Sequence, residues 1–344
     1  MMVLVSRTID VSVIMPIYQT KKEYLEKAIL SVLNQSFQNF EFIILNDSPY
    51  DKRIKKIIEK FKDERIRYLE NDTNIGIAKS YNKLLEQSKG KYIALMNHDD
   101  EMLSCRLEKQ FNFLEANSDV GLVGSGYKKF GELNRFKNIY GPKNHEEIMA
   151  MFLFKSPIHH PTIMMRRDII KKYNIRYNEE FISLNDRQFC WEFGKYAKLY
   201  NIDEVLYKYR FHPDMTSKIE KFKIRKEKAV FHKLWFLYYG IALNEKEVFV
   251  LDNYVTIGRA KIKDKKTIKD VVLVLEKLAY VNKVKKIISE DIFNEICGKY
   301  VQKRCLNAIF RSFINVKDVV NSSILPMKKK TKILLLNSVL GWRN

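Results

Sequence analysis

The sequence predicts an α/β fold with a mainly parallel sheet flanked by helices and a basic, mostly helical C-terminal region. From residue 11 to residue 125, short apolar runs alternate with amphipathic helical patterns, and this alternation is typical of parallel sheets with helices on both faces. The net charge of +21 is uneven: residues 216–344 contain 28 of the 62 Lys+Arg but 12 of the 41 Asp+Glu. We therefore predict one domain over residues 1–215 and a second over residues 216–344.

Composition excludes several classes of protein. The chain is 46% hydrophobic but has no run of 18 apolar residues, so we expect a globular protein without a spanning helix. Its N-terminus, MMVLVSRTIDVSVIM, lacks the pattern of a signal peptide, so secretion is not expected. The four cysteines show no CxxC spacing, which argues against a zinc site or a disulfide framework and fits a reducing cytosol.

The first predicted strand, VSVIMPI, ends near Pro16, because proline cannot donate to a central ladder. Apolar residues at helical spacing then predict a helix over residues 21–35. A second strand over residues 40–45 ends at Asn46 and Asp47. The alternation continues with a helix over residues 52–61, a strand over 65–69, a polar turn over 71–76 and a helix over 77–86.

The stretch KYIALMNHDDE begins with an apolar strand over residues 92–96 and ends in clustered polar residues. The adjacent carboxylates of Asp99 and Asp100 repel one another unless a cation or a buried proton intervenes. The alternative is an acidic start to the helix predicted over residues 103–115. Ligands of parallel sheets bind at the carboxyl ends of the strands. The polar loops after all four strands meet there, which favours a metal site.

Phosphate-binding motifs of two common classes are absent from the sequence. No GxGxxG follows the first strand and no GxxxxGK[ST] occurs, which argues against a dinucleotide-binding dehydrogenase and a P-loop nucleotidase. The phosphates of a bound nucleotide would instead be bridged by Mg²⁺ or Mn²⁺ held by carboxylates. Tyr18 could stack on a base or simply pack in the core.

Four segments in order, VSVIMPIY, SVLNQSFQNFEFIILNDS, NIGIAKSYN and YIALMNHDD, resemble the nucleotide-binding half of family 2 glycosyltransferases with a GT-A fold. The resemblance covers residues 10–215. It implies that Pro16, Tyr18 and Asp47 border the nucleotide base, with Asp47 hydrogen-bonded to it. It also implies that Asp99 and Asp100 form the DxD-type metal and diphosphate site.

Two positions depart from the family pattern. Asn97 replaces the usual first acid of the DxD-type motif, so we expect Asp99 to be the direct ligand. Tyr81 stands before Asn82, where the family often has arginine, and we leave Tyr81 out of the predicted site.

Beyond the strand predicted over residues 120–125 the pattern is less regular. Gly124, Gly126 and Gly131 surround YKKF and predict either an irregular acceptor-side loop or a surface hairpin.

The segment KSPIHHPTIMMRR predicts an extended entry to a strand, because each of its prolines restricts the preceding residue. His159 and His160 then point to opposite sides and should not share a metal. The segment resembles the HPT-containing strand of polysaccharide-building glycosyltransferases. This implies that both histidines line the sugar and acceptor pocket; structural roles are the alternative.

Asn185 and Asp186 begin a predicted amphipathic helix. By resemblance, Asp186 aligns with the second acid of the family's ED motif, its general base, and Asn185 stands in place of the glutamate. The alternative is that either residue only caps the helix.

LYKYRFHPDMTS, residues 206–217, predicts a last strand that places Arg210 and His212 on one side. The segment resembles the family's YRxH segment, which implies that His212 approaches the metal or diphosphate. Arg210 is assigned with the histidines to the sugar and acceptor pocket.

The region after residue 215 alternates apolar helical stretches with lysine-rich segments. A basic face with Trp235, Tyr238 and Trp342 suits a peripheral platform on an anionic membrane, and a solvated helical bundle is the alternative. We expect a cytoplasmic protein on the inner face of the cell membrane.

These observations together predict an inverting, divalent-metal-dependent glycosyltransferase. It would move a sugar from a nucleotide donor to a hydroxyl of a growing, lipid-linked glycan of a bacterial surface. We expect the donor to be a UDP-sugar. Two alternatives stay open. One is a basic nucleic-acid-binding protein, although no recognised motif for this is present; the other is a glycosyltransferase-like scaffold without turnover.

Overall fold

The computed structural model describes residues 8–131, 137–212, 223–256 and 265–298. The chain divides into two compact units: Met1–Ile148 with Ser156–Glu220, and Met149–Lys155 with Lys221–Asn344. The domain boundary predicted between residues 215 and 216 lies outside the described residues and stays a prediction.

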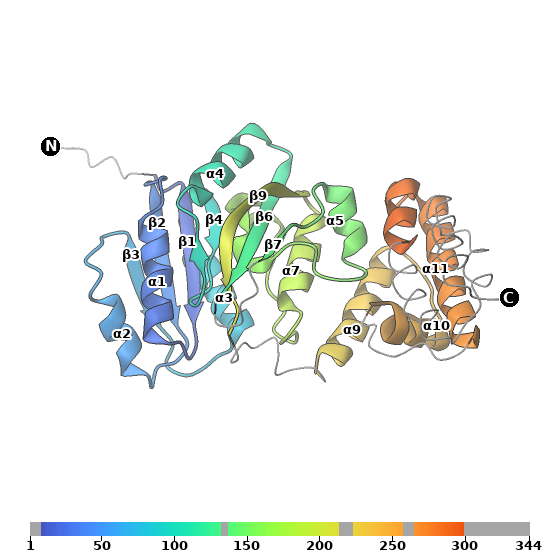
Figure 1. The fold of residues 1–344 in the computed structure, drawn as a ribbon, viewed down its shortest axis with the longest axis horizontal. Coiled ribbons are helices and arrows are strands. Elements are labelled where there is room, and N and C mark those ends of the chain that lie inside the picture. The colour runs from blue at the N-terminus through green and yellow to red at the C-terminus, as the bar shows by residue number, and fades with distance from the viewer. Residues whose placement is uncertain (1–7, 132–136, 213–222, 257–264, 299–344) are drawn as a thin grey trace, which may run out of the picture. The chain divides into compact units, whose positions relative to one another are not determined.

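The first unit is built on a nine-stranded sheet in the order β3-β2-β1-β4-β8-β6-β9-β5, with β7 paired to β6 (Figure 1). Its strands are β1 (Val11–Ile17), β2 (Phe40–Asn46), β3 (Ile66–Glu70), β4 (Tyr92–Leu95), β5 (Glu101–Met102), β6 (Val120–Phe130), β7 (Lys137–Ile139), β8 (Met164–Arg166) and β9 (Lys198–Arg210). The first four strands are parallel, as predicted. β8 then pairs antiparallel with β4 and β6, and β9 pairs parallel with β6.

Helices cover both faces of the parallel strands, which explains why β1, β2 and β4 are buried throughout. The helices are α1 (Lys22–Leu33), α2 (Lys52–Ile58), α3 (Ile77–Gln87), α4 (Arg106–Ala116), α5 (His145–Met151), α6 (Arg167–Tyr173) and α7 (Asn185–Gly194). Alternate β1 residues such as Val13 and Met15 share one core with α1, α2 and α4. The predicted α/β architecture is confirmed, and the elements predicted between residues 11 and 116 end within three residues of the observed ends.

Of the two alternatives for YKKF, the irregular loop was wrong and the hairpin is confirmed. YKKF is the end of β6, where the strand pairs antiparallel with β7 and parallel with β9, with register shifts beside Gly126. Gly131 then ends the strand at φ +111°, where a side chain would be strained. The extended entry predicted around His159 and His160 is confirmed for His159 but was wrong from His160 on, since His160–Thr162 forms a 3₁₀ turn before β8.

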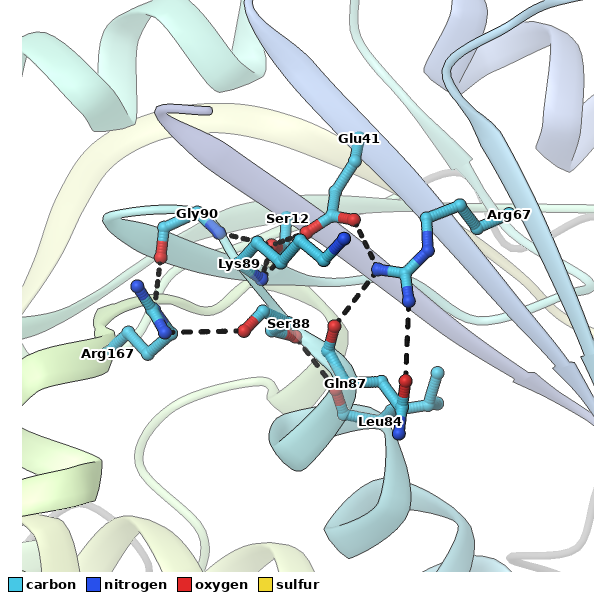
Figure 2. A network of polar contacts seen from close by, with 9 residues as sticks. All are labelled: Ser12, Glu41, Arg67, Leu84, Gln87, Ser88, Lys89, Gly90 and Arg167. Atoms are coloured by element: carbon cyan, nitrogen blue, oxygen red, sulfur yellow. Dashed lines mark hydrogen bonds and ion pairs between the residues drawn. The ribbon is translucent and has the colours of Figure 1, made fainter. Parts of the chain in front are cut away.

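A buried carboxylate holds the amino ends of the strands together, at the edge opposite the polar loops (Figure 2). Glu41 of β2 accepts hydrogen bonds from the Ser12 hydroxyl (2.6 Å) and the Lys89 backbone N–H (2.7 Å), and it pairs with Arg67 of β3 at 2.5 Å. Burial alone would raise the Glu41 pKa, but these partners outweigh burial and lower it. Gly90 is required beside this network, because a Cβ there would lie 2.5 Å from the Ser12 nitrogen.

The second unit is helical, as predicted. It contains α9 (Lys223–Tyr238), α10 (Glu245–Val250), the π-helical segment η2 (Leu251–Thr256) and α11 (Lys265–Lys285). Buried His232 of α9 bonds through Nδ1 to Asp252 and through Nε2 to the Leu153 carbonyl (3.1 Å), so it joins three segments of this unit.

Trp235 was predicted at a membrane-facing surface, and this was wrong. It is 1% exposed, because the apolar side of α9 forms the core of the helical unit. Tyr238 is half exposed, and Trp342 lies outside the described residues. Within the described helices, none is both long and apolar enough to cross a bilayer.

Candidate active site

Backbone contacts bring together the loops that follow β1, β2 and β3. The Asp47 N–H donates to the Ile17 carbonyl (2.8 Å), and the Asn71 N–H donates to the Asn46 carbonyl (3.0 Å). The Gln19 N–H reaches the Ser48 hydroxyl (3.1 Å). Parallel strand order therefore places the predicted base-binding residues at the carboxyl ends of neighbouring strands. Their binding of a base stays a prediction.

The carboxylate of Asp47 organises the turn that leads into α3. It accepts hydrogen bonds from the Asn71 amide (2.8 Å) and from the N–H groups of Ile75 (2.9 Å) and Gly76 (3.0 Å). Gly76 has φ +87°, which favours glycine. A carboxylate has about four acceptor positions, so Asp47 keeps about one for a ligand.

Pro16 and Tyr18 lie at the carboxyl end of β1. Pro16 is buried in the strand opposite Leu45, whereas Tyr18 is 48% exposed. The structure thus argues against a core role for Tyr18 and leaves its ring available for stacking.

Asp100 is turned into the protein. Its carboxylate is fully buried and accepts the Arg210 N–H (2.7 Å), the Tyr207 hydroxyl (3.0 Å) and the Asn97 amide (3.0 Å). Burial and the charge of Asp99 raise the Asp100 pKa well above its usual range. The side chain therefore joins β4 to β9, and it does not share the accessible position of Asp99.

Asp99 faces His212, two residues beyond β9. Its Oδ2 lies 3.0 Å from the imidazole Nε2, and its side chain is partly exposed. Burial alone would raise the Asp99 pKa, but the hydrogen bond from His212 and the charges of His98 and His212 outweigh burial and lower it. The pair offers one carboxylate, a ligand type that suits Mn²⁺ and Mg²⁺, beside one imidazole. Among the described residues no group of three or more His, Cys, Asp or Glu could hold an ion.

Arg210 supports the same turn from the side. Its Nε donates to the Asp99 carbonyl (2.7 Å), and its Nη2 contacts the Glu101 carboxylate (2.8 Å). The guanidinium also lies over the rings of Tyr24 and Phe130, 4.5 and 4.4 Å from their centroids. These contacts hold the 99–101 turn, and the place of Arg210 in the sugar and acceptor pocket stays a prediction.

The two histidines have different neighbours, as predicted. The His159 ring stacks on Tyr127, with centroids 3.9 Å apart, while His160 Nε2 lies 2.7 Å from the Tyr177 hydroxyl. Burial lowers the pKa of each histidine to about 3, so both are neutral at pH 7.

Asp186 lies in the first turn of α7, but it is not the N-cap. Leu184 holds that position without a side-chain cap, and Asp186 Oδ1 accepts the Arg187 N–H (2.6 Å). After burial, its charge contributes to raising the pKa values of Tyr81, Tyr177 and Cys190, so its carboxylate lies within electrostatic reach of these three side chains.

Tyr81 of α3 is the residue that the sequence did not identify. After burial, the charges of Asp100, Asp186 and Asp99 all raise its pKa, so these carboxylates lie within electrostatic reach of its hydroxyl. Its place at a position where the family often has arginine was the one sequence signal, but a tyrosine among apolar helical positions is usually a core residue.

Buried polar atoms without partners mark the same region. Among the described residues, His98 Nδ1, His159 Nε2 and Asn185 Nδ2 are buried and make no hydrogen bond. Unsatisfied buried atoms are rare and often indicate a missing ligand or water. All three belong to segments that contribute predicted site residues.

Residues 12–174 match the model of "Glycosyl transferase family 2". An uncharacterized glycosyltransferase of Methanocaldococcus jannaschii is 34% identical over 221 residues, which cover 62% of this chain and 76% of that protein. The chain belongs to glycosyl transferase family 2. The O-antigen biosynthesis glycosyltransferase WbnJ of Escherichia coli is 30% identical over 218 residues, or 60% of this chain and 82% of that protein.

The family assignment confirms the predicted glycosyltransferase activity and favours it over nucleic-acid binding. Solved structures agree with the fold: S. aureus TarS 1–349 in complex with UDP-GlcNAc superposes with a TM-score of 0.56 at 16% identity, covering 97% of this chain and 93% of that chain. A second TarS structure, in complex with UDP, gives a TM-score of 0.53 at 16% identity, covering 88% of this chain and 92% of that chain. The GT-A-type fold predicted from the sequence is thereby confirmed.

Proposed function

We propose that this family 2 glycosyltransferase is an inverting enzyme that transfers a sugar from a UDP-linked donor to a hydroxyl of a growing, lipid-linked surface glycan. The arrangement that supports this most directly is that Asp99 and Asp100, from the end of β4, and Asp186, from α7, all lie within electrostatic reach of Tyr81. An inverting transfer needs a donor-side acid cluster and an acceptor-side base in one site. The UDP and UDP-GlcNAc complexes of TarS and the O-antigen role of WbnJ support the donor and glycan assignments.

Asp186 is the proposed base. An acceptor hydroxyl is a poor nucleophile until its proton is removed. The Asp186 carboxylate would take this proton as the hydroxyl oxygen bonds to the anomeric carbon. The bond between that carbon and the diphosphate oxygen would break at the same time, and the nucleoside diphosphate would leave with the electron pair. A single displacement of this kind inverts the anomeric centre.

Asp99 and His212 are the proposed metal ligands. A divalent cation bound there would neutralise charge on the leaving diphosphate. The described side chains supply two donors, so the other ligands would be diphosphate and water oxygens. Asp100 would contribute by holding the 97–100 segment through Tyr207 and Arg210. Asp47, Pro16 and Tyr18 are proposed to border the base.

The helical unit is proposed to dock on an anionic membrane, where lipid-linked acceptors would be presented. On α11, Leu273, Tyr280 and Val284 are more than half exposed and recur at helical spacing. Exposed Lys266 and Lys269 precede them at the same spacing. An apolar stripe with flanking lysines is typical of helices that lie in a membrane interface.

A donor screen tests the proposal. The full-length protein would be incubated with Mn²⁺ or Mg²⁺ and UDP-, GDP- and dTDP-sugars, and released nucleotide would be measured with and without a glycolipid acceptor fraction. We expect metal-dependent release of UDP from one sugar nucleotide. Binding of UDP-sugar without release or transfer under any condition would favour the scaffold alternative.

A further inference from the structure

Within the described residues, the hydroxyl of Tyr81 is a polar group without a hydrogen-bond partner on an otherwise buried side chain. Tyr81 is 3% exposed, yet its hydroxyl makes no hydrogen bond to any residue in the described parts of the chain. It is also not among the fully buried unsatisfied atoms, so the remaining exposed surface includes its hydroxyl. Buried tyrosines usually hydrogen-bond through this group, and its position therefore calls for a ligand.

The ring is fixed by its neighbours. Tyr177 stacks on it with centroids 4.9 Å apart, and His160 meets it edge-on at 5.0 Å. Tyr177 is held in turn, because the Asn82 side chain bonds to both its N–H (2.9 Å) and its carbonyl (3.0 Å). The ring of Phe189 on α7 lies 4.0 Å from the other side of Tyr177. Tyr81 is thus preorganised between α3 and the helix that carries Asp186.

The surroundings select the chemistry of the partner. Burial and the three nearby carboxylates raise the Tyr81 pKa, so the hydroxyl stays protonated and can both donate and accept. The same carboxylates disfavour a phosphate at this position. A neutral, hydroxyl-rich group such as a sugar can hydrogen-bond the Tyr81 hydroxyl and is not repelled by the carboxylates.

We propose that the Tyr81 hydroxyl hydrogen-bonds the transferred sugar of the donor, between the Asp99 side and the Asp186 side of the site. This inference rests on the proposed function, and it makes Tyr81 a substrate-contacting residue that contributes to sugar binding and selectivity. The nucleotide is bound elsewhere, by the loops after β1 and β2. The Tyr81 hydroxyl should therefore contribute to the affinity for sugar nucleotides and not to the affinity for UDP.

Tyr81→Phe tests this, because it removes only the hydroxyl and keeps the stacked ring. Affinities for UDP and for UDP-glucose, UDP-galactose and UDP-N-acetylglucosamine would be measured by calorimetry on the full chain with Mn²⁺. The best-bound sugar nucleotide of the parent would be the probe. We expect the substitution to weaken its binding about 3- to 10-fold, the effect of one neutral hydrogen bond, with the UDP affinity and the melting temperature unchanged.

Tyr177→Phe is the matched control, since it removes a hydroxyl one ring away that is bonded to His160. This substitution should lower the free energy of unfolding and leave the difference in affinity between UDP and the probe unchanged. Two outcomes would overturn this inference but not the proposed function. One is equal affinity of the parent for UDP and every UDP-sugar; the other is a Tyr81→Phe variant with the same difference in affinity between UDP and the probe as the parent. A parent that binds neither UDP nor any UDP-sugar would overturn the proposed function as well.

Discussion

His212 Nε2 lies 3.0 Å from Asp99 Oδ2, which joins the segment after β9 to the end of β4. The two residues are 113 positions apart in the chain. Neighbouring Asp100 has the same side-chain chemistry but points into the core. Adjacent carboxylates thus have separate roles: one is accessible beside an imidazole, and the other holds the strands together.

This difference predicts different effects for two matched substitutions. Asp99→Asn should abolish the increase in UDP affinity caused by Mn²⁺ and leave the free energy of unfolding nearly unchanged. Asp100→Asn should lower the free energy of unfolding by about 3 kcal/mol, because an amide cannot accept from all three buried donors. Calorimetric titration and urea unfolding measure the two effects. Full activity in EDTA, or loss of metal-dependent binding only in Asp100→Asn, would contradict the assignment.

Acid should destabilise the protein partly through His160. Its pKa is about 3 in the folded state against 6.5 ordinarily, so below pH 6.5 the unfolded chain binds the proton first and stability falls. At pH 5 this amounts to about 2 kcal/mol. His160→Gln keeps an acceptor for Tyr177 but cannot titrate. Between pH 7.5 and pH 5.0, urea unfolding should show a loss about 2 kcal/mol smaller in this variant, and an equal loss would argue against a neutral buried His160.

The face of α11 predicts salt-sensitive binding to anionic vesicles. Each lysine near such a surface contributes about 1 kcal/mol, so Lys266→Gln with Lys269→Gln should weaken binding about 30-fold in co-sedimentation. Tyr280→Glu should weaken it further. Tyr50→Glu, which alters an exposed tyrosine of the first unit, is the control and should bind normally. Binding that is insensitive to both α11 variants would reject this docking face.

The sequence predicted the parts that local patterns determine. Periodicity identified the four parallel strands, and their ends correctly placed Asp47 and Asp99 at one edge of the sheet. It could not show that Asp100 turns inward, because that depends on the Tyr207 hydroxyl and the Arg210 N–H from β9. The extension of β6 and the burial of Trp235 also depend on distant pairing and packing. Tyr81 was left out of the predicted site because the family often has arginine there, whereas we propose it as a site residue because three carboxylates lie within electrostatic reach of it.

The most direct test of the account is the transfer rate of Asp186→Asn. The amide keeps the shape of the side chain at the first turn of α7 but cannot act as a base. Transfer should fall by roughly 10²- to 10⁴-fold, while UDP affinity and the free energy of unfolding stay within about 1 kcal/mol of the parent. A transfer rate within a few-fold of the parent would contradict the account and remove Asp186 from the mechanism.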